Sequence, residues 1–398
     1  MKNALNLKTI KDSFIKLSNK SERERNIFLT NLADELLNNS NKILLANKKD
    51  LQNARNNKLS TSFIQRLKLG GSDLKKIIER VQQVRTLDSG IGEIIENKLD
   101  DTGLEIHKVR VSIGTILIIY ESRPEVTIDV ACLCIKSGNV AILKGGSEAL
   151  ETNLVLYDCI KKALIKSSLP KEAVYFIQSK NKNIVRKLLK RNDTIDLIIA
   201  RGGYEMVKAI QNNSSIPVLA HSAGGARIYI DKSANLSIVE KILINAKITK
   251  PSACNSLDTV IIHKDLKDKL LTKIIKSFKE NKVEIIMDEW NQEFLEMKVS
   301  IKIVDSLNDA IDFINTYSKK HSEGIIAQDK NAIDIFCQSI DSATIFVNSS
   351  TRLHDGYVFG LGSEMGIATG KLHARGPVGL KELSIYKWIV YGKGHIRE

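Results

Sequence analysis

The sequence predicts an α/β protein with two α/β units, and three observations carry this prediction. Between residues 113 and 220, short apolar runs of strand character alternate with longer helical runs, a pattern typical of a doubly wound parallel sheet. Residues 221–227, rich in Gly and Ala, interrupt the alternation, and a second series of the same kind starts at Ile228. The chain has 398 residues, enough for two or three domains with cores of their own.

The composition is that of a globular protein with a basic surface. Apolar residues make up 43% and charged residues 27% of the chain, and the net charge is +14 at pH 7. The lysines are interleaved with acidic residues, and aromatic residues make up only 5%, too few for an evident base-stacking platform. We therefore expect no nucleic-acid partner, and a surface that favours anionic substrates and cofactors.

No membrane segment is expected. No window approaches the roughly 18 consecutive apolar residues that a membrane helix needs. The first residues carry no apolar signal core. We expect a cytoplasmic protein without membrane contact.

The cysteines indicate neither disulfides nor metal. They form an odd and sparse set without paired spacing, which argues against a disulfide framework. Histidines and carboxylates at ligand spacing are absent as well, so we expect no metal. The five are Cys132, Cys134, Cys159, Cys254 and Cys337.

The elements follow in order along the chain. Residues 1–97 are expected to be mostly helical, with Ser21 and Glu24 as a capping box, and residues 98–111 predict a hairpin outside the main sheet. The first series predicts strands at 114–120, 140–144, 174–177, 195–200 and 218–220, and helices at 126–137, 148–166, 184–190 and 204–211. The second series predicts strands at 228–230, 257–263, 301–304, 324–327 and 343–347, and helices at 238–249, 266–280 and 307–317. A last apolar strand is expected at 383–390 and could pair with a partner subunit.

Three turns of the first series are candidate anion-binding sites. Ligands of parallel sheets bind at the carboxyl ends of the strands, and each turn places backbone N–H groups or a cation near a helix start. No G-x-G-x-x-G fingerprint is present. The turns are Ser122-Arg123, Lys144-Gly145-Gly146 and Arg201-Gly202-Gly203.

Cys254 is the candidate nucleophile. A thiolate attacks acyl carbon well, and the thioester that it forms can accept a hydride. Pro251 ends the preceding helix and favours an irregular turn, whose N–H groups could bind an oxyanion. Lys247 and Lys250 bring positive charge that would favour the thiolate. The alternative is a buried structural cysteine, since free Cys is often buried.

The Gly-rich stretch from residue 355 to 377 is a candidate lid or anion cradle. Gly-rich loops are commonly plain surface loops, but this stretch and its flank carry two arginines and two histidines. They are Arg352, His354, His373 and Arg375.

Taken together, these motifs resemble the gamma-glutamyl phosphate reductases (glutamate-5-semialdehyde dehydrogenases), a branch of the aldehyde dehydrogenase superfamily. The resemblance covers essentially the whole chain. It is carried by YESRPEVT at 120–127, LKGGSEA at 143–149, PSACN at 251–255, VNSSTR at 347–352 and KLHARGP at 371–377.

The resemblance implies an aldehyde-dehydrogenase-like fold with a cofactor-binding domain at 1–227, a catalytic domain at 228–376 and an oligomerisation tail at 377–398. The hairpin at 98–111 would contribute to oligomerisation. A homo-oligomer is therefore expected, and association with glutamate 5-kinase would protect the unstable acyl phosphate.

The implied reaction is the NADPH-dependent reduction of L-glutamyl 5-phosphate to L-glutamate 5-semialdehyde and phosphate, in proline biosynthesis, through a thioacyl intermediate on Cys254. Ser122 would help to bind the oxyanion. Substrate binding falls to Arg123, Arg352, His373 and Arg375. Cofactor binding falls to Lys144, Arg201, Gly202, Gly203 and Glu293.

One departure from the wider superfamily supports a reductase. Hydrolytic aldehyde dehydrogenases carry a general-base Glu before a Gly-Gly pair, whereas residues 220–225 here read AHSAGG. Two alternatives stay open: another acyl-phosphate or aldehyde oxidoreductase on the same fold, and a non-catalytic basic binding protein.

Overall fold

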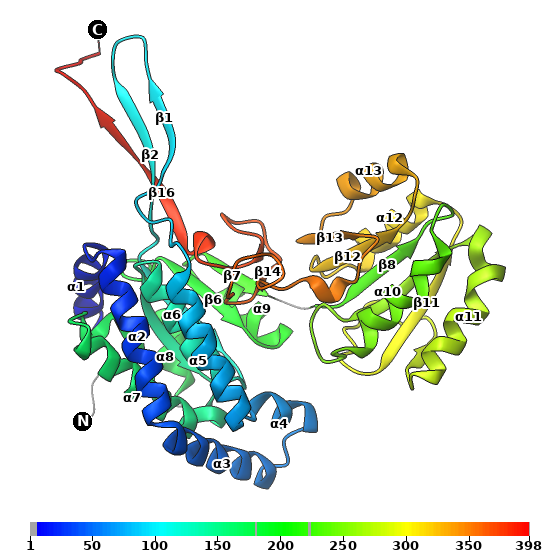
Figure 1. Cartoon of the computed structure of the whole chain (residues 1–398), viewed down its shortest axis with the longest axis horizontal. Helices are drawn as coiled ribbons and strands as arrows, with labels where there is room; N and C mark the ends of the chain where they lie inside the picture. Colours follow the sequence, from blue (N-terminus) through cyan, green and yellow to red (C-terminus); the bar gives the residue numbers. More distant parts are fainter. Residues whose placement is uncertain (1–5, 180, 222–223, 398) are drawn as a thin grey trace. The chain divides into compact units, whose positions relative to one another are not determined.

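The computed structural model describes residues 6–179, 181–221 and 224–397, and the chain divides into two compact units (Figure 1). Unit 1 comprises residues up to 219 together with 360–366 and those from 378 onward. Unit 2 comprises residues 220–359 and 367–377. Each unit contains its own parallel sheet, as the two series in the sequence predict.

The sheet of unit 1 has the strand order β5-β4-β3-β6-β7. Pairing is parallel between β3 and each of its two neighbours, and the chain reverses direction across the sheet after β5, so that β3 and β6 form the switch point. All six residues of β3 are buried. The strands are β3 (Thr115–Tyr120), β4 (Val140–Gly145), β5 (Val174–Phe176), β6 (Leu197–Arg201) and β7 (Val218–His221).

Helices cover this sheet in layers. The connecting helices α6 and α7 pack on the strands they join, and α2, α3 and α5 pack outside them. The predicted capping box at the start of α2 is present, with Ser21 and Glu24 bonded reciprocally. The helices are α1 (Leu7–Ser18), α2 (Glu22–Asn38), α3 (Ser40–Asn56), α4 (Thr61–Leu67), α5 (Gly71–Thr86), α6 (Glu125–Lys136), α7 (Leu150–Lys166), α8 (Lys182–Leu188) and α9 (Tyr204–Asn213).

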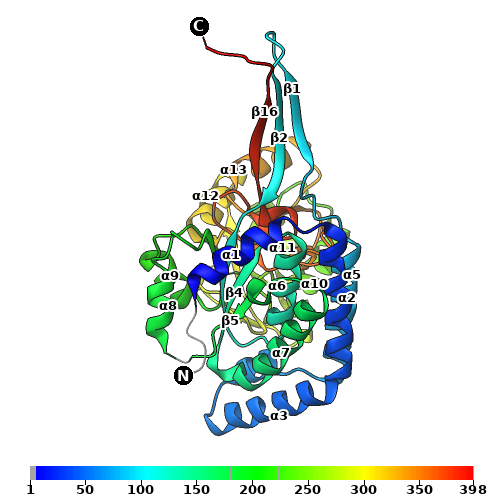
Figure 2. The ribbon, with the colours of Figure 1, turned by 90° about the vertical axis from the view of Figure 1, so that its left-hand side faces the viewer.

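A separate three-stranded antiparallel sheet extends from unit 1 (Figures 1 and 2). The predicted hairpin forms β1 (Ile94–Leu99) and β2 (Glu105–Ser112), and the last strand, β16 (Ser384–Tyr391), pairs with β2 over its full length. The terminal strand thus pairs within its own chain. Its side chains Trp388 and Tyr391 remain about half exposed, at 50% and 53%.

Unit 2 has a six-stranded parallel sheet of order β10-β11-β9-β8-β12-β13, with apolar cores on both faces. Its strands are β8 (Ala226–Ile230), β9 (Leu257–His263), β10 (Glu284–Ile286), β11 (Lys298–Val304), β12 (Ser322–Ile326) and β13 (Thr344–Val347). Its helices are α10 (Leu236–Ile248), α11 (Lys267–Glu280), α12 (Leu307–Tyr317) and α13 (Lys330–Ser339). The short strands β14 (Ile367–Ala368) and β15 (Gly376–Pro377) pair with each other.

Several short elements of the described chain went unpredicted: α4, α13, β10, β14 and β15. Helix α4 has only seven residues and β10 only three, too short for a clear period. No helix in the described residues is long and apolar enough to cross a membrane.

Asn139 ties the two sheets of unit 1 together, and its removal tests this packing. Its Oδ1 accepts from the Gly114 N–H at 2.9 Å, and its Nδ2 donates to the Leu383 carbonyl, just before β16, at 2.7 Å. Asn139→Ala should lower the free energy of unfolding by about 2–4 kcal/mol, since each buried polar group left without a hydrogen bond costs about 1–3 kcal/mol. Urea unfolding measures this. Asn53→Ala, at an exposed position of α3, is the control, and an equal loss there would contradict the account.

Candidate active site

The switch point of unit 1 gathers the three predicted turns. Tyr120, the last residue of β3, lies opposite Gly145 of β4 and Arg201 of β6. The Glu121 N–H donates to the Arg201 carbonyl at 3.1 Å, which extends the pairing of β3 and β6 by one hydrogen bond. The candidate cofactor residues Lys144, Arg201, Gly202 and Gly203 therefore share the carboxyl edge of one sheet with the turn that carries Ser122 and Arg123.

Ser122 stands in a strained conformation. Its φ of +56° lies in the left-handed region, which is costly for a residue with a Cβ and is found at functional sites. Its N–H donates to Glu148 Oε1 at 2.8 Å. Its Oγ is buried and makes no hydrogen bond with the described residues. A buried hydroxyl of this kind can bind a ligand oxygen.

The amino terminus of α9 already holds an anion. Glu121 Oε2 accepts from the Gly203 N–H at 2.9 Å, and a Cβ at Gly202 would lie 2.7 Å from the same carboxylate oxygen. A helix amino terminus with free N–H groups is where phosphates bind. The Glu121 carboxylate shows that this terminus accepts negative charge.

Lys144 supplies a cation at the end of β4. Its Nζ donates to the Gly145 carbonyl at 2.6 Å. Burial lowers the pKa of Lys144, and the charge of Glu148 opposes that shift. The side chain is half-buried, so a cofactor phosphate could still reach it.

Cys254 lies in a tight turn before β9, at the amino edge of the sheet of unit 2. The Ala253 N–H donates to the Lys250 carbonyl, and the Ser256 N–H to the Ala253 carbonyl, both at 3.0 Å. Gly224 packs directly on the nucleophile: a Cβ there would lie 2.5 Å from the Cα and the Cβ of Cys254. The turn can therefore shift very little.

Arg352 is a cation that acts on Cys254. Its guanidinium bonds to the Asn255 side-chain oxygen and to Thr249 Oγ1. Burial lowers the pKa of Arg352, while the charge of Cys254 raises it. By reciprocity, this guanidinium favours the thiolate. Lys247, one of the two lysines expected in that role, is instead buried 3.4 Å from Asp258.

His354 fixes the loop that carries Arg352. Its carbonyl accepts from Asn255 Nδ2 at 2.9 Å, and its ring contacts the hydroxyls of Ser322 and Thr344 at 2.7 and 2.9 Å. Ser322 and Thr344 are the first residues of β12 and β13. The histidine predicted as part of an anion cradle is therefore a buried support beneath the Cys254 turn.

The other tail residues lie elsewhere in unit 2. His373 is exposed. Arg375 Nη1 pairs with Asp341 at 2.8 Å, beside Lys320 and Lys371, and these cations lower the pKa of Asp341. Arg375 Nε and Nη2 are buried without a hydrogen bond to the described residues. Two donors of Arg375 are thus available to an anion.

Glu293 lies in the irregular segment between β10 and β11, and its charge acts on Lys319. Among the described residues, no group of three or more His, Cys, Asp or Glu side chains is placed to hold a metal ion. Ser222 and Ala223, part of the stretch that lacks a general base, lie outside the described residues.

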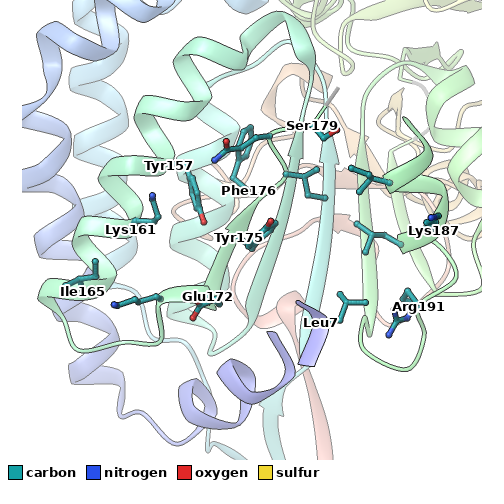
Figure 3. Close-up of a pocket in the computed structure, with 15 residues that line it drawn as sticks. Leu7, Tyr157, Lys161, Ile165, Glu172, Tyr175, Phe176, Ser179, Lys187 and Arg191 are labelled. Carbon is teal, nitrogen blue, oxygen red and sulfur yellow. The ribbon is translucent and has the colours of Figure 1, made fainter. Parts of the chain in front are cut away.

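A groove of about 960 Å³ runs along the free edge of β5, between α7 and α8 (Figure 3). Tyr157 and Tyr175 face it, with Lys161, Lys187 and Arg191 at its rim. None of the predicted site residues is among its lining residues.

The comparisons with known proteins identify the family of the chain. The model of the aldehyde dehydrogenase family matches residues 11–293. The chain is 38% identical to the gamma-glutamyl phosphate reductase of Caldanaerobacter subterraneus, over 98% of both chains, and 40% identical to that of Clostridium kluyveri, over 96% of this chain and 95% of the relative. The chain therefore belongs to the aldehyde dehydrogenase family and, within it, to the gamma-glutamyl phosphate reductases.

Solved structures confirm the aldehyde-dehydrogenase-like fold. The crystal structure of the gamma-glutamyl phosphate reductase of Thermotoga maritima is 35% identical, with a TM-score of 0.95 over 98% of this chain and 99% of the other. A propionaldehyde dehydrogenase of Rhodopseudomonas palustris, with bound CoA and an acylated cysteine, shares the fold at 13% identity, with a TM-score of 0.71 over 97% and 96% of the chains.

Replacing Arg352 tests its effect on the nucleophile. Arg352→Gln should slow alkylation of Cys254 by iodoacetamide at pH 7 by about tenfold, because the thiolate loses its cation. Mass spectrometry of the labelled peptides measures the rate, with exposed Cys337 as an internal reference. Lys276→Gln, which removes an exposed charge on α11, is the control. An unchanged rate in the Arg352 variant would contradict the assignment.

Proposed function

We propose that the protein reduces L-glutamyl 5-phosphate to L-glutamate 5-semialdehyde and phosphate with NADPH, a step of proline biosynthesis. The observation that carries the proposal is a partly exposed Cys254 in a tight turn beside the Arg352 guanidinium, in a chain of this family. The cysteine and the cation together suit an anionic acyl donor.

The first step is acyl transfer to the thiolate. Cys254 Sγ attacks the acyl carbon, the C–S bond forms, and the C–O bond to phosphate breaks, with the electron pair leaving on phosphate. The Cys254 N–H is a donor to the developing oxyanion. We keep Ser122 as a second donor, because its Oγ is buried and lacks a hydrogen bond within the described chain.

The anionic ends of the substrate need cations. Arg123, on the turn after β3, is assigned to the phosphate, and Arg352 to the acyl phosphate beside Cys254. Arg375, with two unpartnered buried donors, suits a carboxylate, to which guanidinium groups bind in a fork. His373 remains a predicted substrate contact.

The residues of unit 1 fit a nicotinamide dinucleotide. The Gly203 N–H, which already holds a carboxylate, would bind the pyrophosphate together with Arg201 and Gly202, and Glu121 would have to release it. Lys144 would face the adenosine ribose and its 2′-phosphate. Glu293, which belongs to unit 2, would face the nicotinamide ribose. NADPH, when bound, supplies the hydride that reduces the thioester to the aldehyde level.

The three-stranded sheet supports a homo-oligomer. The outer edges of β1 and β16 have no strand partner among the described residues, and long apolar side chains on the sheet are exposed, including Leu99 at 70% and Trp388 at 50%. Exposed apolar edge strands are typical pairing surfaces. We assign this sheet to contacts with a second copy. Association with glutamate 5-kinase stays a prediction.

The reverse reaction tests the proposal. Reduction of NADP⁺ by glutamate 5-semialdehyde should require phosphate, because phosphate must release the acyl group, and should disappear in Cys254→Ser. Cys337→Ser, at an exposed cysteine, should keep full activity. Absorbance of NADPH measures the rate. Sustained turnover without phosphate would indicate a hydrolytic aldehyde dehydrogenase, and turnover in Cys254→Ser would remove the nucleophile assignment.

A further inference from the structure

The segment from residue 287 to 297, here called the Glu293 segment, is irregular yet held in strained conformations. It joins β10 to β11 without helix or strand. Two of its residues other than Gly, Asp288 and Leu295, have φ values of +58° and +53°. Such conformations are unfavourable for residues with a Cβ and persist only where the surroundings impose them. The surroundings of this segment contain two buried ion pairs.

The first ion pair holds the segment on the amino-terminal side of Glu293. Arg227, in β8, is fully buried, and its Nη2 donates to the carbonyls of Trp290 at 3.1 Å and Tyr317 at 2.5 Å. Residue 290 is three positions before Glu293. The Trp290 ring also packs edge-on against Phe313 and Tyr317. The main chain at Trp290 is thus fixed from the core.

Glu323 orients that guanidinium. It lies directly opposite Arg227 in the β8–β12 register, accepts from the Arg227 N–H at 3.0 Å and from Nη1 at 3.4 Å, and accepts from Ser318 Oγ at 2.6 Å. Burial raises the pKa of Glu323 to about 7, against the effect of Arg227. Because the Glu323 carboxylate binds Nη1, Nη2 of Arg227 is directed at the carbonyls of Trp290 and Tyr317.

The second ion pair holds the segment on the carboxyl-terminal side. Burial raises the pKa of Asp258, and the main-chain N–H of Phe294 opposes that shift. Lys247 Nζ lies 3.4 Å from Asp258 Oδ1 and 5.9 Å from the centre of the Phe294 ring. Both charged side chains are buried, at 2% and 0% exposure. Phe294 follows Glu293 directly, so Glu293 stands between two anchored positions.

Stability alone does not call for this arrangement. Replacing a buried ion pair with apolar side chains is often neutral or stabilising. Apolar side chains, however, could not bind the Trp290 carbonyl or place a cation against the Phe294 ring. A lysine could not reproduce the forked contact of Arg227 with a carboxylate and two carbonyls. We therefore attribute the buried charges to their contacts with the Glu293 segment, whose main chain they hold in place.

We propose that Arg227 and Asp258 are positioning residues that anchor the Glu293 segment on both sides of Glu293 and so set the place of its carboxylate. The inference rests on the proposed function, which assigns Glu293 to the nicotinamide ribose. A carboxylate that orients the ribose determines how the nicotinamide faces the thioester. Loss of the anchor should therefore slow the reduction step more than it weakens substrate binding.

Arg227→Lys tests the anchor, because it keeps the charge beside Glu323 and removes the fork. Hydrogen exchange of the protein without cofactor should show faster exchange in residues 287–297. At saturating NADPH, kcat should fall about tenfold or more, while KM for the acyl phosphate and the alkylation rate of Cys254 stay within about twofold. Arg25→Lys is the matched control. Arg25 is a buried arginine of unit 1 that also donates to a main-chain carbonyl, that of Lys20.

A double variant separates positioning from general destabilisation. If Arg227 acts through Glu293, Arg227→Lys combined with Glu293→Gln should be no slower than the slower single variant. Rate losses that multiply, unchanged exchange in 287–297, or an equal loss of kcat in Arg25→Lys would each overturn the inference. Wild-type rates in Glu293→Gln would also overturn it. Failure of the proposed function would show instead as absent turnover in the unmodified protein, while the exchange experiment would still report on the anchor.

Discussion

The close backbone contact between Gly224-Gly225 and Cys254 is the constraint on which the site of unit 2 depends. The Gly225 N–H donates to the Cys254 carbonyl at 2.6 Å, and a Cβ at Gly224 would overlap the nucleophile itself. A Cβ at Gly225 would lie 2.4 Å from Asp258 Oδ2. These glycines let two chain segments meet at backbone distance at the amino ends of β8 and β9. The turn that carries Cys254 and the buried ion pairs of Arg227 and Lys247 are consequently packed together.

The charged groups of the two candidate sites are held in different ways. Around Cys254 in unit 2, charges are buried in pairs, as with Arg227 and Glu323, and these pairs fix the main chain of the segments around them. At the switch point of unit 1, charges stand at the ends of strands, where Lys144 is half-buried and Glu121 occupies the amino terminus of α9. Fixed groups suit a nucleophile and its supports, whereas reachable groups suit a cofactor that must enter and leave.

Much of the fold follows from the sequence because apolar runs and turns alternate clearly. The strand 257–263 was predicted with its observed bounds, and the hairpin and both sheets were predicted. Helix α13 was missed, although its buried side chains, Ala332 and Phe336, are four residues apart, because so short an apolar stripe is weak evidence alone. The pairing of β16 with β2 joins residues far apart in sequence, and no local pattern reveals it.

The candidate site was predicted less completely, for physical reasons. Cys254 and the turns of unit 1 could be recognised, since each is a local motif. The partner of Arg352, the buried role of His354 and the pairing of Lys247 with Asp258 could not be predicted. Such contacts depend on the register between strands, as where Arg227 meets Glu323, and only the folded chain sets that register. The Gly-Gly pair at 224–225 was the local signal available, and it was interpreted as a break between units and as the place of a missing general base, not as a contact with Cys254.

The most direct test of the central claim, a thioacyl enzyme on Cys254, is a single-turnover experiment without phosphate. Glutamate 5-semialdehyde and NADP⁺ are mixed with the enzyme, NADPH is followed by absorbance, and the protein is then digested for mass spectrometry. A burst of about one NADPH per chain should form and then stop, and a glutamyl adduct should appear on the peptide that carries Cys254. Added phosphate should remove the adduct and restart NADPH formation. Continued turnover without phosphate, or a burst without an adduct on Cys254, would contradict the claim.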